Sequence, residues 1–99
     1  MAERRAILIH PDDDVAVAVE AGEAGDVVVF ADERVTARQD VPFGFKVARR
    51  AVARGGPVRK YGEVIGLAST AIEPGDVVHT HNLGGARGRG DLVGREARA

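Results

Sequence analysis

Apolar and polar residues alternate with a period of two along much of the chain, most clearly from Val15 to Val19. This alternation is typical of half-buried strands, and no window carries the i, i+3, i+4 apolar stripe of an amphipathic helix. Short apolar runs are interrupted by 13 glycines and four prolines, which favour tight turns. The pattern predicts a mostly β domain with no helix longer than about three turns, and with strands near Ala6–Ile9, Asp14–Val19, Val27–Phe30, Lys46–Ala48, Val58–Tyr61, Ile65–Ser69 and Val77–His81.

A short motif recurs three times in the same register. An alanine is followed seven positions later by a glycine, and three positions after that by a valine. Each copy fits a strand, a compact turn at a glycine that can take positive φ, and a returning strand. Because such hairpin-like units cannot bury a face alone, we expect them to fold over one another. The copies are Ala18, Gly25 and Val28; Ala48, Gly55 and Val58; and Ala68, Gly75 and Val78.

Two segments lie outside these copies. Residues 32–42 are polar and lack periodicity, which predicts a connecting loop between the first two copies. From Leu83 onward glycine, arginine and other charged residues dominate, and such a composition buries little surface. We therefore expect a folded domain over residues 1–83 and a flexible tail over residues 84–99.

The composition indicates one domain without a bias toward a polyanionic partner. A length of 99 residues suits one domain, and the formal net charge is −1, so we expect neither nucleic acid nor a membrane as a partner. The absence of cysteine excludes a disulfide, a thiolate nucleophile and a cysteine-bound metal within the sequence. The apolar run Ala6–Ile9 is too short for a signal-peptide core, so we expect a cytoplasmic protein.

Basic residues are nearly all arginine, and Lys46 and Lys60 are the only lysines. An ammonium group is compact and has a tunable pKa, so it can serve where a guanidinium cannot. The two lysines either mark such positions or persist by chance in an arginine-rich composition.

Several motifs together resemble those of a known family. The sequence VPFGFKVA at residues 41–48 precedes KYGEVIGLA at residues 60–68, and IEPGDVVHTHNL follows at residues 72–83. This series resembles the SAF domain that opens altronate and galactarate dehydratases, where GHK-x-A, KYG-x-x-IG-x-A and VH-x-HN follow one another. The segment IHPDDDVAV at residues 9–17 is similar to the family's opening segment, which usually contains D-N-V-A. The resemblance covers residues 7–83, and KYG-x-x-IG joined to VH-x-HN at this spacing is specific.

The resemblance implies a β-clip fold of short folded-over strands and a role in a hydro-lyase that removes water from a sugar acid. It also implies a divalent metal, iron or manganese, in the assembled enzyme, with no ligand certain in this chain. Family members carry the domain fused to a much larger domain or as a separate chain, and this short chain resembles the separate small subunit. We therefore expect a large catalytic subunit and a sugar-acid substrate as partners, and leave a homo-oligomer of the isolated chain open.

The chain departs from the family pattern at two positions. Phe45 stands where the family has the histidine of GHK, so any substrate or metal contact of that histidine is lost. Asp14 stands where asparagine is usual, which is a milder change. Either the chemistry differs, or the histidine's role lies elsewhere in the site, or the domain is a degenerate paralogue.

Five residues are candidates for a site: we expect Tyr61 and His81 to be catalytic, and Lys46, His79 and Asn82 to bind substrate. A lysine can pair with a carboxylate, a tyrosine can transfer a proton, and an asparagine can bond polyol hydroxyls. The two histidines lie two apart on a predicted strand, so both imidazoles would leave one face and could hold a metal or a carboxylate. The structural alternatives are surface histidines, a tyrosine packed against its turn, and an asparagine that caps the strand.

The run Asp12 to Asp14 beside His10 is a further oxygen-rich candidate. These carboxylates could bind a divalent cation, although such a run is more often a solvated turn that leads into a strand. We therefore leave the aspartates out of the predicted site.

The chemistry itself argues for a partner. Dehydration of a sugar acid requires a base, an acid for the leaving oxygen and a cation to stabilise an enolate-like intermediate, in a water-restricted cleft. This chain offers two or three suitable side chains and little volume, so we expect it to complete an active site on a separate large subunit and to be inactive alone. Two rivals stay open: the small subunit of a sulfolactate sulfo-lyase-like enzyme, and a non-catalytic carbohydrate-binding or assembly module with a SAF fold.

Overall fold

The computed structural model describes residues 2–85, and nine strands and no helix lie in that range. None of these residues therefore belongs to a helix that could span a membrane. The strands are β1 Glu3–Ile7, β2 Val15–Ala18, β3 Val27–Phe30, β4 Glu33–Thr36, β5 Lys46–Ala48, β6 Pro57–Lys60, β7 Glu63–Ala68, β8 Val77–Val78 and β9 Leu83–Gly85.

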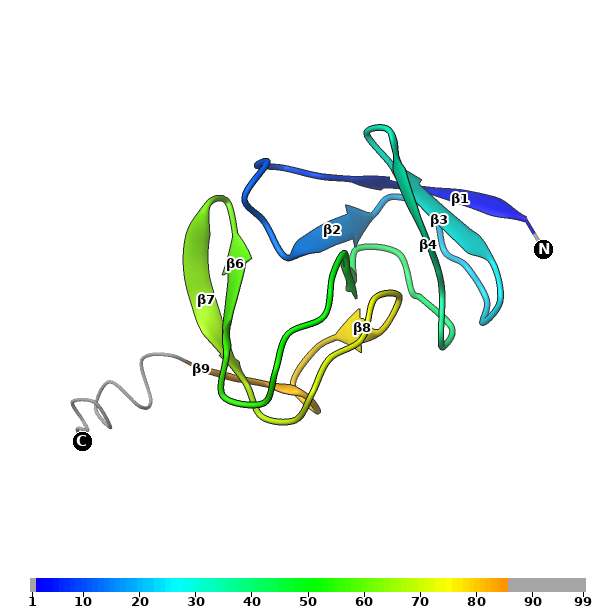
Figure 1. The fold of residues 1–99 in the computed structure, drawn as a ribbon. Coiled ribbons are helices and arrows are strands. Elements are labelled where there is room, and N and C mark those ends of the chain that lie inside the picture. Colours follow the sequence, from blue (N-terminus) through cyan, green and yellow to red (C-terminus); the bar gives the residue numbers. More distant parts are fainter. Residues whose placement is uncertain (1, 86–99) are drawn as a thin grey trace.

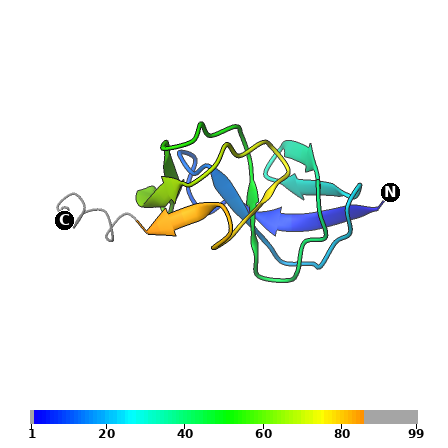
Figure 2. The same cartoon turned by 90° about the horizontal axis from the view of Figure 1, so that it is seen from below.

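The strands form two sheets. One has six strands in the order β4-β3-β1-β2-β5-β8, and the other has three in the order β6-β7-β9. Neighbouring strands are antiparallel except β1 and β3, which are parallel. Figures 1 and 2 show the β3–β4 hairpin at one end of the molecule and the β6–β7 hairpin at the other, with β2, β5 and β8 between them. The predicted mostly β fold without a long helix is confirmed over the described residues.

The three predicted copies of the motif each form a four-residue turn with glycine in the third position. The glycine φ values are 93° for Gly25, 85° for Gly55 and 92° for Gly75. The first turn is closed by a hydrogen bond of 2.9 Å from the Asp26 N–H to the Glu23 carbonyl oxygen, and equivalent bonds close the other two. Positive φ in the third position is the requirement of a type II turn, so the predicted turn chemistry is confirmed.

A fourth copy lies where the sequence predicted a loop. Ala37, Gly44 and Val47 have the same spacing, and Gly44 has a φ of 85°. Strand β4 also lies within residues 32–42, so the prediction of a connecting loop there is wrong. β4 is an edge strand whose residues alternate between half-buried and exposed, and its polar sequence Glu-Arg-Val-Thr suits that position.

The copies are not hairpins, because the strands on either side of each turn do not pair with each other. We number the copies first to fourth in chain order. The Ala18 N–H of the first copy donates to the Phe45 carbonyl oxygen of the second at 2.9 Å, and the Ala18 carbonyl oxygen accepts from the Gly44 N–H at 2.8 Å. Ala37 makes the equivalent two bonds with the first turn, and the third and fourth copies exchange bonds in the same way. The repeats are therefore two interlocked pairs.

The buried apolar side chains form two clusters, and β2, β5 and β8 lie between them. Successive residues of these strands face alternate clusters, so that Val47 belongs to the first core and Ala48 to the second. The first core contains Ala6, Ala16, Ala18, Val28, Phe30, Ala37, Val41, Val47 and Val77. The second core contains Val15, Ala48, Val52, Val58, Ala68, Ile72 and Val78.

Two strands extend into segments where the sequence predicted none. β1 begins at Glu3 rather than Ala6, and its charged residues are held by partners, as Arg4 Nε is by Asp26 Oδ2 at 3.2 Å. β9 extends two residues past the predicted end of the domain, since Gly84 and Gly85 pair with β7. This pairing uses backbone groups only, so glycines without side chains can form it. The rest of the predicted tail, residues 86–99, lies outside the described residues.

Replacement of the turn glycines by alanine should separate the energetic cost of a left-handed backbone from the cost of a steric clash. At Gly55 a Cβ atom would meet nothing within 4 Å, so Gly55→Ala should cost only the left-handed backbone penalty, about 1–2 kcal/mol. At Gly75 a Cβ atom would lie 1.9 Å from the Thr36 carbonyl oxygen. Gly75→Ala should therefore cost about 1–3 kcal/mol more. Equal losses in the free energy of unfolding, measured by urea denaturation, would contradict the close packing of the fourth turn.

Candidate functional site

The β6–β7 hairpin ends in a two-residue turn formed by the tyrosine and the glycine of the KYG motif. The φ values are 61° for Tyr61 and 75° for Gly62, the left-handed geometry of a type I′ turn. This backbone costs a non-glycine residue roughly 1–2 kcal/mol, and such strain clusters at functional sites. Ala31 has a φ of 52° in another hairpin turn, so strain alone does not mark a site. Tyr61 differs because it is 62% exposed and carries the Lys60 ammonium 4.9 Å from the centre of its ring.

The carboxylate of Asp13 holds this turn in place. The residue is fully buried, and its Oδ2 accepts the Tyr61 N–H at 3.0 Å and the His10 N–H at 3.2 Å. Its Oδ1 accepts the Gly62 N–H at 2.7 Å. A buried carboxylate is tolerated when hydrogen bonds replace its hydration. These bonds tie the β1–β2 loop to the hairpin, and they determine where the functional groups of Tyr61 and its neighbour Lys60 lie.

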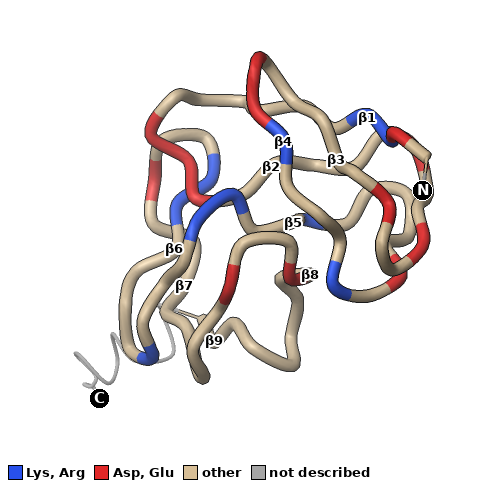
Figure 3. The backbone as a smooth tube through the Cα atoms, turned by 45° about the vertical axis from the view of Figure 1, so that its right-hand side comes forward, with Lys and Arg blue, Asp and Glu red and all other residues tan. Residues whose placement is uncertain are grey.

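The neighbouring carboxylate supports β6 itself. Asp14 Oδ2 accepts the Arg59 N–H at 2.8 Å, and Oδ1 lies 2.9 Å from Arg50 Nε. Figure 3 shows the acidic β1–β2 loop next to the basic stretch at β6. The carboxylates of the buried Asp13 and the half-buried Asp14 are thus both occupied by internal bonds. Within residues 2–85 no group of three or more histidine, aspartate or glutamate side chains is arranged to hold a metal.

Lys46 lies at the start of β5, paired with Val17 of β2 and Val78 of β8. It stands two residues before Ala48, so its half-buried side chain leaves the second-core face of the strand. Burial, and secondly the charge of Lys60, lower the pKa of Lys46 below its usual value. The charge that acts on Lys46 is that of the ammonium that lies over the Tyr61 ring.

The predicted strand that includes His79 and His81 ends before them, at Val78. The next four residues form a turn, in which the Leu83 N–H donates to the His79 carbonyl oxygen at 2.9 Å. The expectation that both imidazoles leave one face of a strand is therefore wrong. β8 pairs with β5 over only two residues, and the side chain of Asn82 then bonds to the backbone of the turn.

Asn82 is 4% exposed, and its amide is occupied within the turn. Oδ1 accepts the His79 N–H at 2.9 Å, and Nδ2 donates to the Val77 carbonyl oxygen at 2.9 Å. This is the capping role that was the alternative to sugar binding. The His79 ring stacks on Phe45 with ring centres 4.7 Å apart, and Phe45 packs against the first core. His79 therefore lies on the opposite face of β5 and β8 from Lys46, while His81 is exposed on the turn.

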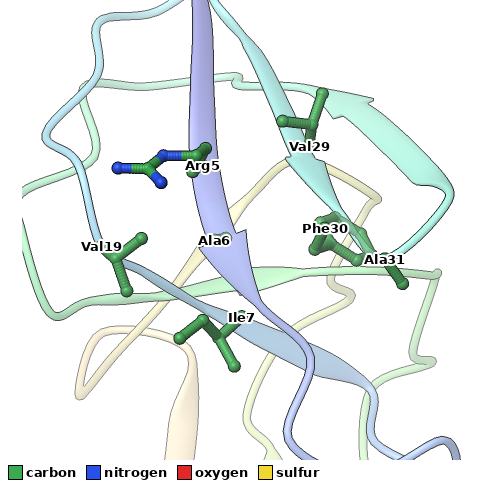
Figure 4. A pocket seen from close by; sticks show the side chains of 7 residues that line it. All are labelled: Arg5, Ala6, Ile7, Val19, Val29, Phe30 and Ala31. Atoms are coloured by element: carbon green, nitrogen blue, oxygen red, sulfur yellow. The ribbon is translucent and has the colours of Figure 1, made fainter.

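A hollow of about 390 Å³ lies at the other end of the molecule, over β1 and β3 (Figure 4). Its lining is mainly apolar and contains none of the predicted site residues; it consists of Arg5, Ala6, Ile7, Val19, Val29, Phe30 and Ala31. The Lys60 ammonium lies over the ring of Tyr61, and the charge of Lys60 acts in turn on Lys46. We call these three residues the lysine–tyrosine surface.

Sequence reasoning did not assign a role in the site to Lys60 or Asp13. Lys60 could have been singled out from the sequence, because it is one of only two lysines. Asp13 could not have been singled out, because the sequence does not distinguish three consecutive aspartates and only the structure shows which carboxylate is buried.

Comparisons with known proteins agree on one family. The sequence profile of the altronate/galactarate dehydratase SAF domain matches residues 4–86. Altronate dehydratase of Escherichia coli (strain K12) is 45% identical over 76 residues, which make up 77% of this chain and 15% of that protein. Altronate dehydratase of Bacillus subtilis (strain 168) is 30% identical over 76 residues, with the same coverage of 77% and 15%.

A third relative is named as a subunit. The (2R)-sulfolactate sulfo-lyase subunit alpha of Paracoccus pantotrophus is 48% identical over 52 residues, which make up 52% of this chain and 78% of that subunit. The chain thus spans about 15% of each altronate dehydratase and most of the sulfo-lyase subunit. With the all-strand structure, the profile match confirms the predicted β-clip fold.

Removal of the Asp13 carboxylate should release the hairpin turn. Asp13→Ala leaves three backbone N–H groups without their acceptor, so the free energy of unfolding should fall by roughly 2–4 kcal/mol. Asp12→Ala is the matched control, because that side chain is exposed and its loss should change stability by less than about 0.5 kcal/mol. Chemical denaturation of both variants measures the difference, and similar stabilities would show that the carboxylate does not hold the turn.

Proposed function

The chain belongs to the SAF-domain family of altronate and galactarate dehydratases, and on this basis we propose that it completes the active site of a sugar-acid hydro-lyase. The observation that carries this proposal is the family match over residues 4–86, joined to the exposed, left-handed Tyr61 within its KYG motif. Altronate dehydratases among the relatives support a sugar acid as the substrate class. The substrate then meets the lysine–tyrosine surface as it enters the catalytic cleft.

In this proposal each polar group of the site has a role that its chemistry allows. The Lys46 ammonium binds a carboxylate, and the Tyr61 hydroxyl bonds or protonates a leaving oxygen. His81 reaches the substrate from the second exposed turn, whereas His79 and Asn82 hold that turn in shape. The surface is open to solvent, and dehydration requires exclusion of water. A larger catalytic unit must therefore cover it.

A divalent cation, iron or manganese, belongs in this proposal to the assembled enzyme, where it would stabilise the negative charge that develops beside the carboxylate. His79 and His81 lack a third described ligand, so the groups in residues 2–85 do not fit a complete metal site. The catalytic unit supplies most or all of the ligands.

We propose further that the catalytic unit is a separate large subunit. The match to a relative that is itself named subunit alpha, of which this chain covers 78%, supports this arrangement. The same match makes a sulfolactate-type acid the second candidate substrate, with a sulfo-lyase reaction in place of dehydration.

Reconstitution tests the proposal. The chain alone, supplied with Fe²⁺ or Mn²⁺, should not turn over altronate, galactarate or sulfolactate, because it lacks an enclosed site and a full set of acid–base groups. Activity toward one of these acids should appear when its cognate large subunit is added. Turnover by the isolated chain, or equal activity of the large subunit without it, would overturn the two-subunit proposal.

Variants of the two exposed turns locate the contribution of this chain in the same assay. Tyr61→Phe and His81→Ala should each lower the activity of the mixture by about tenfold or more, as loss of a positioned polar group does. Both should change the free energy of unfolding of the isolated chain by less than about 0.5 kcal/mol relative to the unmodified chain. Thr80→Ala, an exposed neighbour on the second turn, is the control and should retain full activity. If the variants assemble and turn over normally, the two side chains are surface residues.

A further inference from the structure

His10 belongs to the β1–β2 loop but lies against the tip of the β6–β7 hairpin. Its backbone N–H donates to Asp13 Oδ2 at 3.2 Å, and the same oxygen accepts the Tyr61 N–H at 3.0 Å. One carboxylate oxygen thus holds both backbones, and the His10 side chain begins next to the exposed turn. This side chain is half-buried, and the function proposed above gives it no role.

The imidazole of His10 packs with one face against Gly62. A Cβ atom at Gly62 would lie 2.9 Å from His10 Cδ2, 3.0 Å from Nε2 and 3.1 Å from Cγ. A point almost equally distant from three consecutive ring atoms lies above the ring plane rather than beside its edge. Gly62 therefore covers a face of the ring and leaves the directions within the ring plane open, and these are the directions in which both ring nitrogens form hydrogen bonds.

One of the two ring nitrogens is occupied within the loop. The Asp12 N–H donates to His10 Nδ1 at 3.1 Å. A ring nitrogen that accepts a hydrogen bond carries no proton, so the neutral imidazole carries its proton on Nε2. Of the three histidines, all of which lie within residues 2–85, only His10 accepts a hydrogen bond at its ring from a described residue. The fold thus selects one tautomer of this side chain.

The other ring nitrogen is left without a partner among the described residues. The backbone N–H, the backbone carbonyl oxygen and Nδ1 of His10 each form a hydrogen bond within residues 2–85, whereas Nε2 forms none. Because the ring is packed on one face and bonded at Nδ1, the Nε2–H has a fixed direction. The ring could take up a second proton only by giving up its bond to the Asp12 N–H. His10 is therefore suited to donate a hydrogen bond rather than to act as a base.

We infer that His10 is a further substrate-binding residue, whose Nε2–H donates a hydrogen bond to an oxygen of the acid substrate beside the Tyr61 turn. The inference rests on the proposed function for the identity of the ligand as a sugar acid, whose carboxylate and hydroxyl oxygens are both acceptors. A donor with a fixed direction loses little conformational freedom when it binds, so it can orient the acid relative to Tyr61.

Nuclear magnetic resonance of the isolated chain with ¹⁵N-labelled histidine tests the donor directly, because the nitrogen chemical shift differs widely between protonated and unprotonated ring nitrogens. In mildly alkaline buffer His10 should show a protonated Nε2 and an unprotonated Nδ1. The loss of one set of signals in His10→Asn identifies His10, since the signals of His79 and His81 remain. The opposite tautomer at His10, or an even mixture of the two, would overturn the inference.

Two variants separate the donor from the structural role of the loop. In His10→Asn the amide ends at the position of Nδ1, so its oxygen can still accept the Asp12 N–H, as in an Asx turn, but the donor at Nε2 is lost. In His10→Gln the amide nitrogen reaches the position of Nε2 and keeps a donor there. Both variants lose the ring that covers Gly62, so loss of this packing cannot account for a difference in activity between them.

The readout is kcat/KM of the reconstituted mixture with the large subunit. His10→Asn should lower it by about tenfold or more, whereas His10→Gln should stay within about threefold of the unchanged chain. If His10 only shaped the loop, His10→Asn would be the more active of the two, and that order would overturn the inference. A mixture that is inactive even with the unchanged chain would count against the proposed function, while the tautomer of His10 would still decide whether the donor exists.

Discussion

The backbone hydrogen bonds exchanged between paired turns are the constraint on which the fold depends. Each motif alanine donates its N–H to the glycine turn of another copy and accepts an N–H from the glycine of that turn through its carbonyl oxygen. No copy can therefore form these hydrogen bonds without its counterpart. Type II turns supply the exposed N–H and C=O groups for this exchange only if the third residue takes positive φ, which glycine does at little cost. Two such exchanges create two cores, and the strands between the cores are buried on both faces.

The lysine–tyrosine surface follows from this arrangement and from one buried carboxylate. Strands between two cores direct successive side chains to opposite sides, which separates Lys46 from the stacked Phe45 and His79. The Asp13 carboxylate then fixes the tip of the β6–β7 hairpin above the second core. Phe45, which stands in place of the family histidine, fills space against the first core and the His79 ring. The Phe45 side chain therefore lies on the opposite face from that of Lys46.

Much of the fold could be predicted from the sequence, because its strongest signals are local. Period-two alternation and the glycine turns depend on neighbouring residues, and both are as expected. β4 and β9 were missed because edge pairing needs few apolar side chains, so polar and glycine-rich segments can form strands. The fourth copy at Ala37 had the same spacing as the others, but its polar surroundings resembled a loop. The turn after Val78 depends on the side-chain bonds of Asn82, which strand periodicity does not reveal.

The site was less predictable because it depends on contacts between distant parts of the chain. Tyr61 and Lys46 were recognised as polar groups in family motifs, and the structure shows Tyr61 exposed at the β6–β7 turn and Lys46 half-buried at the start of β5. The position of the β6–β7 turn requires that β6 lie beside β2, which no local pattern encodes. The role of Asp13 likewise requires a carboxylate in one loop to meet a turn that lies 48 residues away.

Amide chemical-shift mapping of the ¹⁵N-labelled chain, with and without the proposed large catalytic subunit, tests most directly whether the lysine–tyrosine surface faces that subunit. The largest changes should fall at the start of β5, at the β6–β7 turn and at the turn after β8. The residues around the hollow of Figure 4 should change least. A complex that shifts the signals of β1 and β3 and leaves the β6–β7 turn unchanged would contradict the assignment of this surface.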